Sequence, residues 1–242
     1  MSELFSIQLQ NRQQQGRDGI WLDLPTTTEQ VQAALRQIGI SSDNPQGLFI
    51  SGYFAEEEKR IAIPYNMVLA SNVDELNFLA ARLETLSAGE RAELNAALQA
   101  PQSELFSIGR ITDFPENVDY YVHLPDVRGP AQLGDYYLNR SGMVDMPEEW
   151  KGGIDTAQFG RYVAQQEQGA FTQYGYLIKS GDEWQKVHEG QPVPEEYRVL
   201  SFPVPEVMRD AANIPPPVQP ETEPQKVIPI ILNGKDSAER MK

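Results

Sequence analysis

The sequence predicts an α+β fold: three small segments in tandem, the middle one helical, followed by a proline-rich tail. Three observations lead to this prediction. Short apolar stretches with strand character lie on both sides of a central region. Leucines recur at helical spacing through that central region, and eight prolines fall within 27 residues from Pro203 onward. We therefore divide the chain into 1–70, 71–102, 103–202 and 203–242.

Residues 1–70 are expected to form a mixed unit of three strands and one helix. The strands are expected at residues 4–9, 20–24 and 48–54. Apolar residues recur at helical spacing from Val31 to Ile38, and Gly39 is expected to end that helix. Thr26, Thr27 and Thr28 are N-cap candidates at its start, and Thr26 and Glu29 have the spacing of a capping box.

Residues 71–102 are expected to form two short helices joined as a hairpin. Apolar residues keep a three-four spacing over 73–86, and Ser71 or Asn72 could provide the N-cap. The stretch 87–90 is typical of a break followed by a new helix start.

Residues 103–202 form the largest segment. Helices are expected at residues 131–140 and 157–164, and strands at 120–124, 171–178 and 197–202. Residues 103–108 repeat residues 2–7 letter for letter, SELFSI, but six residues are too few to indicate a duplication. The tail, 203–242, favours an extended linker over 203–226 and then the start of a helix, either a frayed tail or the approach to a further domain.

Composition excludes several functional classes. Cysteine is absent and only His123 and His188 are present, so we expect no metal site and no cofactor. No phosphate-binding, zinc-protease or serine-hydrolase motif occurs, and we expect no enzyme activity. A hydrolase built on two carboxylates stays a weaker alternative, because carboxylates are abundant. The N-terminus lacks a signal-peptide pattern and no apolar run could span a membrane, so we expect a cytoplasmic protein without a membrane partner.

The formal net charge of −15 argues against direct binding to nucleic acid. The excess lies mostly outside the tail: the net charge is −3 over 1–70, −3 over 71–102, −8 over 103–202 and −1 over 203–242. The carboxylates are mostly single and well spaced. They are consistent with an ordinary acidic surface, or with a rigid surface that imitates the phosphates of duplex DNA.

Several segments, in order, resemble the ArdA antirestriction proteins over about residues 3–200. Residues 16–25, GRDGIWLDLP, resemble the family's N-terminal signature, and 47–56, GLFISGYFAE, its next strand. Residues 73–86 resemble its central helix. Residues 133–147, LGDYYLNRSGMVDMP, and 150–163, WKGGIDTAQFGRYV, resemble its C-terminal region.

The resemblance implies an elongated, usually dimeric DNA mimic that occupies the DNA groove of type I restriction-modification enzymes and so protects mobile genetic elements. It also implies that residues 142–156 carry the antirestriction motif near the dimer contact. The dimer-contact candidates are then Met143, Val144, Met146 and Trp150. The phosphate-mimic candidates are Asp74, Glu75, Glu84, Asp113, Glu116, Asp119, Asp126, Asp135, Asp145, Glu148, Glu149 and Asp155.

A second function hypothesis belongs to another class. The folded part could be an ArdA-like interaction module of a longer mobile-element protein, with 203–242 leading to a further domain. The sequence leaves this alternative open beside the inhibitor.

Overall fold

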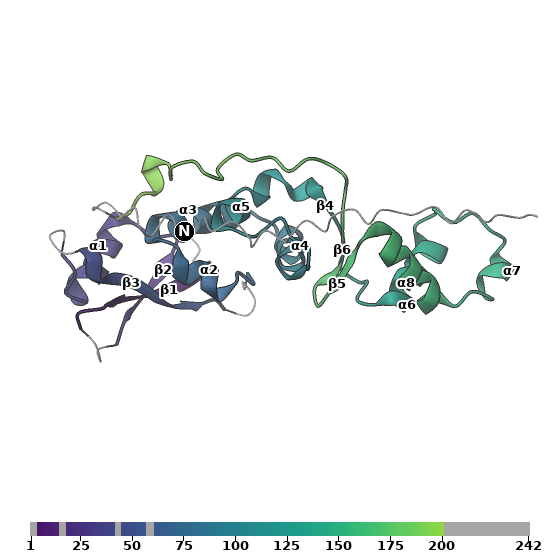
Figure 1. Cartoon of the computed structure of the whole chain (residues 1–242), viewed down its shortest axis with the longest axis horizontal. Coiled ribbons are helices and arrows are strands. Elements are labelled where there is room, and N and C mark those ends of the chain that lie inside the picture. The colour runs from purple at the N-terminus through teal and green to yellow at the C-terminus, as the bar shows by residue number, and fades with distance from the viewer. Residues whose placement is uncertain (1–3, 15–17, 42–44, 57–60, 201–242) are drawn as a thin grey trace, which may run out of the picture. The chain divides into compact units, whose positions relative to one another are not determined.

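The structure is a computed structural model that describes residues 4–14, 18–41, 45–56 and 61–200 (Figure 1). These residues form helices and antiparallel strands, which confirms the α+β prediction. The tail predicted at 203–242 and the end of the strand predicted at 197–202 lie outside the described residues. The three-segment division stays a prediction.

The first sheet is built from three antiparallel strands in the order β2-β1-β3. They are β1 (Phe5–Asn11), β2 (Ile20–Leu24) and β3 (Leu48–Phe54), as the sequence predicts. Alternate residues of β1 are buried, as expected for a sheet with one covered face. Helix α1 (Thr28–Gln37) begins after Thr27, one of the three expected N-cap candidates, and its capping box pairs Thr27 with Gln30 rather than Thr26 with Glu29.

The middle region contains α2 (Tyr65–Ala70), α3 (Val73–Glu84) and α4 (Ala88–Gln99). Helix α2 was not predicted, since six residues are too short for a clear periodic pattern. Capping boxes start both α3, with Asn72, and α4, with Ser87. The expected helical hairpin is wrong: α3 packs on α5 (Ile108–Thr112) and β2, whereas α4 packs on the second sheet.

The second sheet has the strand order β4-β6-β5. Strand β4 (Tyr121–Leu124) was predicted, but the single strand expected over 171–178 is a hairpin of β5 (Ala170–Thr172) and β6 (Gly175–Lys179). Gly175 has a φ of +134°, which allows the tight turn that an apolar pattern does not reveal. Residues 198–200 form no strand.

The repeated hexapeptide adopts two different structures. Residues 5–7 lie in β1, whereas Ser107 caps α5 and Ile108 is the first residue of that helix. The repeat is therefore not a repeated structural unit.

A helical subdomain is inserted between β4 and β5. It consists of α6 (Pro130–Asp135), a π-helical turn (Tyr136–Arg140), α7 (Glu148–Lys151) and α8 (Thr156–Glu167). Helices α6 and α8 approach closely at two glycines: a Cβ on Gly134 would collide with the Thr156 carbonyl, and one on Gly160 with the Pro130 carbonyl. Both glycines lie in segments on which the family resemblance rests.

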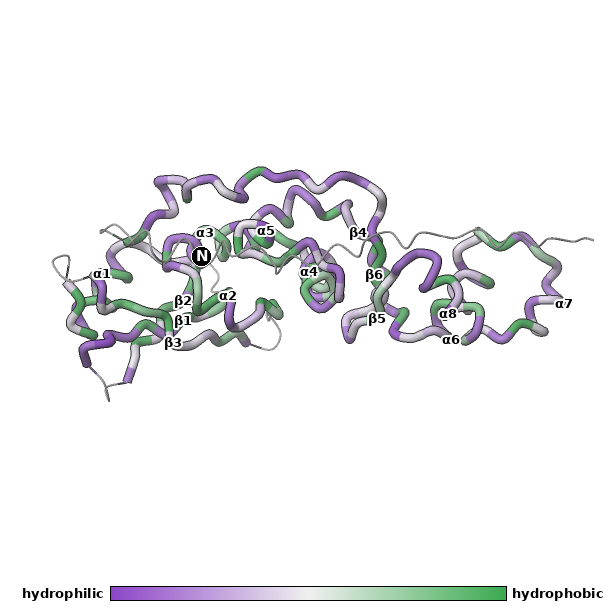
Figure 2. Tube along the Cα trace, in the orientation of Figure 1, coloured by the Kyte–Doolittle hydropathy of each residue, from purple (hydrophilic) through white to green (hydrophobic). Residues whose placement is uncertain are grey.

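Two hydrophobic cores support these elements. The larger runs from Leu4 through α3 and α5 to Val199, and the smaller one lies between α6, α8 and the second sheet around Leu133 and Tyr176. After β6, residues 180–200 return alongside α5 and α3 in an extended course, which we call the strap (Figure 2). The strap is mostly hydrophilic, so hydrogen bonds have a large part in holding it.

Candidate partner-binding surface

An exposed stretch joins the π-helical turn to α8, and we call residues 141–155 the motif segment. It holds all four dimer-contact candidates. Met143 is 76% exposed and Trp150 is 66% exposed, while Val144 and Met146 are partly buried. Large apolar side chains at this exposure are not core residues, and they suit a contact with another protein.

Four carboxylates accompany these apolar side chains on the motif segment. Asp145, Glu148, Glu149 and Asp155 are all exposed. Glu148 pairs with Lys151 at 2.9 Å. Asp155 caps α8, because one carboxylate oxygen accepts the backbone N–H groups of Ala157 and Gln158 at 2.9 and 3.0 Å.

Asp126 and Asp135 precede the motif segment in the chain. Asp126 is exposed, and Asp135 is half-buried. Hydrogen bonds from Asn139 and Arg140, at 2.8 and 2.7 Å, lower the pKa of the Asp135 carboxyl, so it is ionised near neutral pH. Arg140 neutralises part of this charge.

Glu116 and Asp119 lie on the 3-10 turns before β4, and both are exposed. Glu116 forms an ion pair with Arg82 of α3. The pKa of Glu93 is raised to about 8. Burial is the largest cause, and the nearby negative charges of Glu90 and Asp119 add to it.

Asp113 is not at the surface. It is fully buried, and its carboxylate accepts the backbone N–H groups of His188 at 2.6 Å and Glu189 at 3.2 Å. We therefore remove Asp113 from the phosphate-mimic candidates, because a partner cannot reach it. The neighbouring apolar residues Ile111 and Phe114, both fully buried, are the sequence signal that could have indicated this.

Asp74, too, serves the interior. Its carboxylate oxygen accepts the backbone N–H groups of Val199 at 2.7 Å and Leu200 at 2.8 Å. Burial raises the pKa of Asp74, and those two hydrogen bonds oppose the rise. Like Asp113, Asp74 holds the strap. It is half-buried, and because its carboxylate is engaged with the strap backbone, Asp74 is a weak phosphate-mimic candidate.

Glu75 and Glu84 are half-buried on α3. The Glu75 carboxylate accepts the backbone N–H of Asn72 at 3.3 Å and so completes the capping box. Because this carboxylate is engaged with its own helix, Glu75 is a weak candidate. Neither residue lies near the motif segment in sequence.

Two asparagines, absent from the predicted residues, complete the anchoring of the strap. Asn117 accepts the N–H of Gln185 at 2.7 Å and donates to its carbonyl at 2.9 Å. Asn77 donates to the Tyr197 carbonyl at 3.0 Å and accepts the N–H of Thr26 at 2.7 Å. Polar side chains of this kind match long-range backbone groups, which a sequence pattern cannot identify.

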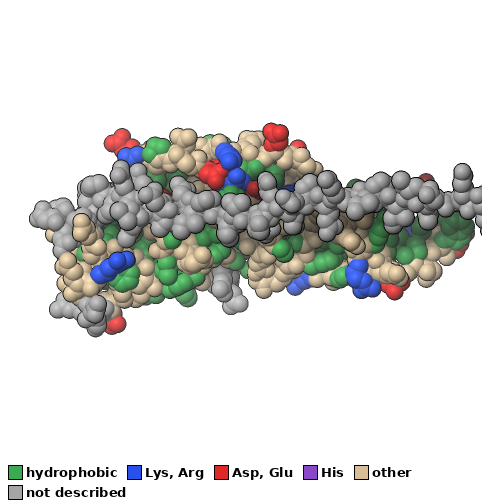
Figure 3. All heavy atoms as spheres, in the orientation of Figure 1, with side chains coloured by type: hydrophobic (Ala, Val, Ile, Leu, Met, Phe, Trp, Pro, Cys, Tyr) green, Lys and Arg blue, Asp and Glu red, His purple; other side chains and the backbone are tan. Residues whose placement is uncertain are grey.

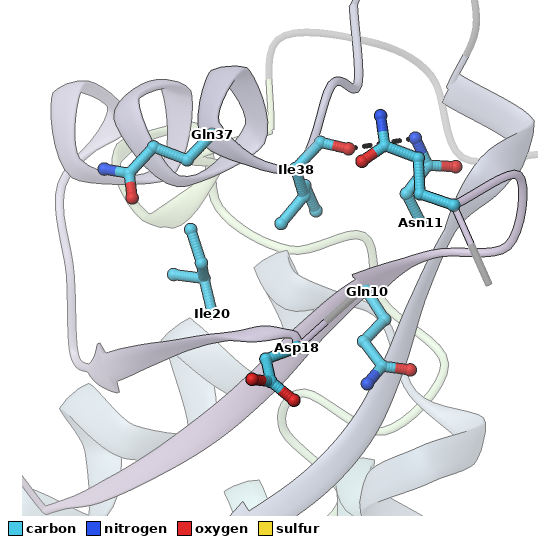
Figure 4. Close-up of a pocket in the computed structure, with 7 residues that line it drawn as sticks. Gln10, Asn11, Asp18, Ile20, Gln37 and Ile38 are labelled. Atoms are coloured by element: carbon cyan, nitrogen blue, oxygen red, sulfur yellow. Dashed lines mark hydrogen bonds between the residues drawn. The ribbon is translucent and has the colours of Figure 1, made fainter. Parts of the chain in front are cut away.

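Two cavities are formed by described residues, and their described lining does not resemble a catalytic site. The small pocket in Figure 4, about 130 Å³, lies between the ends of β1 and α1, where Asn11 donates to the Ile38 carbonyl at 3.0 Å. Among the described residues that line it, Asp18 is the only charged one. A second cavity of about 420 Å³, beside the end of α8, is lined by Tyr121, Glu167 and Lys179 among others. Within the described residues, no group of His, Asp or Glu side chains could hold a metal ion.

Acidic side chains are few and separated on the face drawn in Figure 3. On the part of that face that is not drawn in grey, the exposed carboxylates do not form a continuous row. In the described part of the chain, the helices are all too short or too polar to cross a lipid bilayer.

A comparison with protein-family models matches residues 15–178 to the antirestriction protein family ArdA. A search of curated proteins finds no match. The matched residues include β2 and β3 of the first sheet, the middle helices, the motif segment and nearly all of the second sheet, whereas β1 precedes them. Antirestriction activity implies interaction with restriction enzymes. Because the match spans well over half of the chain, the protein belongs to the ArdA family of antirestriction proteins.

Proposed function

We propose that this protein inhibits type I restriction-modification enzymes by occupying their DNA groove, with surface carboxylates in the place of DNA phosphates. The observation that carries the proposal is the exposed acidic surface of residues 116–155. This stretch contains eight acidic and three basic residues. Seven of the eight carboxylates are exposed, and Asp135 is half-buried.

Cations offset this charge only in part. Within the described residues, ion pairs engage Glu116, Asp135 and Glu148. The other carboxylates of the stretch make no ion pair there: Asp119, Asp126, Asp145, Glu149 and Asp155. Carboxylates without a local cation are available to the lysines and arginines that line a DNA-binding groove.

Several of these carboxylates lie on helices and turns, which favours their use as phosphate mimics. Asp119 lies on a 3-10 turn, Glu149 on α7, and Asp155 at the N-cap of α8. A carboxylate fixed on a folded element loses little conformational entropy when it docks, whereas a flexible acidic tail would lose much. The inhibitor then acts in the cytoplasm by competition alone, without a catalytic step, a cofactor, a membrane or direct binding to nucleic acid.

The proposal includes a homodimer formed through the motif segment. Met143 and Trp150 are the most exposed of its large apolar side chains, and an apolar contact between two copies would remove them from water. Two copies would also place two acidic surfaces in one particle, which suits a groove that normally holds an extended duplex.

A charge-removal experiment tests the proposal. The triple variant Asp126→Asn, Asp145→Asn, Glu149→Gln removes three unpaired carboxylates of the acidic stretch. We expect it to raise the concentration for half-inhibition of a type I enzyme about 30-fold, corresponding to about 2 kcal/mol for three exposed charges.

The matched control removes three exposed carboxylates elsewhere, Asp18→Asn, Glu183→Gln and Glu195→Gln. Both variants change the net charge by the same amount. Equal inhibition by the two variants would show that overall charge, and not the surface of residues 116–155, determines binding.

A further inference from the structure

One carboxylate in the helical subdomain binds two tyrosines. Glu167, the last residue of α8, accepts the hydroxyl of Tyr137 on one oxygen and that of Tyr176 on the other, the latter at 2.9 Å. Tyr176 is fully buried and Tyr137 is 9% exposed. A Cβ on Gly169 would collide with the Tyr176 hydroxyl, so the backbone beyond α8 leaves room for this arrangement.

The two tyrosines have different onward connections. Tyr176 lies in β6 and packs on Phe171 of β5, with ring centroids 4.8 Å apart. Tyr137 lies in the π-helical turn directly before the motif segment. Such turns are frequent at functional sites.

A chain of hydrogen bonds leads from Tyr137 into the motif segment. The Tyr137 carbonyl accepts the Ser141 hydroxyl at 2.9 Å, and the Ser141 oxygen accepts the backbone N–H of Met143 at 3.1 Å. Met143 is the most exposed apolar side chain of the segment. At the other end, Asp155 caps α8, the helix that ends in Glu167.

We propose that Glu167 is a positioning residue for the motif segment, acting through Tyr137 and Ser141. Helix α8 then holds both ends of the segment, with Asp155 at its start and Glu167 at its end. Tyr176 binds the same carboxylate but leads into the sheet. The positioning role would hold the partner-binding surface in one conformation, and this consequence rests on the proposed function.

The matched pair Tyr137→Phe and Tyr176→Phe tests the inference in the full chain. Each variant removes one hydroxyl from the same carboxylate, but only Tyr137 leads to Met143. Ser141→Ala breaks the same path farther on without touching Glu167. The first readout is hydrogen exchange at the Met143 amide, and the second is the concentration for half-inhibition of a type I enzyme.

Ser141→Ala removes the acceptor of the Met143 N–H, and Tyr137→Phe removes the hydroxyl bond that fixes the turn whose carbonyl holds Ser141. Both variants should speed exchange at Met143 about fivefold or more, the effect of one lost hydrogen bond, and should weaken inhibition to a similar extent. Tyr176→Phe should change both readouts less than about twofold. Glu167→Gln, which keeps one oxygen acceptor, should lie between the wild type and Glu167→Ala.

Unchanged exchange in Tyr137→Phe, or the same change in Tyr176→Phe, would overturn the inference. Faster exchange with unchanged inhibition would overturn the link to partner binding. If the wild type inhibits no type I enzyme, the proposed function fails, and the exchange comparison still decides whether Glu167 positions the segment.

Discussion

The buried carboxylate of Asp113 accepts the backbone N–H of His188 across 75 positions of sequence, at 2.6 Å. A second bond from Glu189 engages its other oxygen. Asp113, which the sequence places among the surface carboxylates, is therefore an anchor for the strap. This relationship separates the carboxylates that hold the fold from those that a partner can reach.

Asp113→Ala should lower the free energy of unfolding by about 3 kcal/mol, because the backbone N–H groups of two half-buried residues lose their acceptor and a fully buried side chain leaves a cavity. Asp113→Asn should cost less, since one oxygen remains. Urea denaturation measures both. Asp126→Asn, at an exposed position, serves as the control and should stay within about 0.5 kcal/mol of the wild type. A similar stability for Asp113→Ala and the control would contradict the anchoring role.

Gly160→Ala should destabilise the helical subdomain, because its Cβ would meet the Pro130 carbonyl of α6. Overpacking of this kind costs about 1–3 kcal/mol. Gly152→Ala is the matched control: Gly152 has a helical φ of −64°, and a Cβ there meets no atom of the described chain. Thermal unfolding that ranks the two variants equally would argue against the close helix contact.

Glu93 should make stability depend on pH. Its pKa rises from 4.5 to about 8 in the folded protein because burial disfavours the charged form, and one carboxylate oxygen is buried without a hydrogen-bond partner among the described residues. The stabilising contribution of the neutral form is complete below pH 4.5 and is lost as the pH rises to about 8.

Glu93→Gln cannot ionise, so it should be more stable than the wild type at alkaline pH, by about 1 kcal/mol after discounting for solvent screening. Melting curves at acidic and alkaline pH measure the effect. The prediction is wrong if the difference between the two proteins does not grow as the pH rises.

Trp150→Glu should weaken the proposed dimer by at least about tenfold, because aromatic anchors commonly dominate such contacts. Sedimentation over a concentration series measures this change. Phe54→Glu, at a side chain 58% exposed on β3, is the control for adding a charge at an exposed aromatic position. A dimer that survives Trp150→Glu, or a wild type that is monomeric, would contradict the proposed interface.

The sequence predicted much of the secondary structure because local signals determine it. Asn72 and Ser87 stand where helix caps are expected, and the strand at 20–24 has the predicted bounds. The hairpin at Gly175 was missed because residues 171–178 were taken as one strand, although Thr172 and Gln173 precede a glycine with positive φ. The predicted hairpin of α3 and α4 was wrong because the packing of these helices depends on contacts with other elements, which helical periodicity does not reveal.

The roles of the candidate surface residues stay predictions, and the structure shows only which of these residues are exposed. The motif segment does present Met143 and Trp150. The sequence could not separate Asp113 from Asp126, since burial depends on the strap that returns from far along the chain. Glu167 was also missed, because its two tyrosine partners come from elements that only the fold brings together.

The most direct measurement of DNA mimicry is the affinity of the protein for a type I enzyme, measured without DNA over a range of salt. If carboxylates replace phosphates, affinity should fall at least about tenfold between about 50 and 200 mM salt, and a DNA duplex should displace the protein. Affinity that stays constant over this range, or binding that a duplex does not displace, would contradict mimicry.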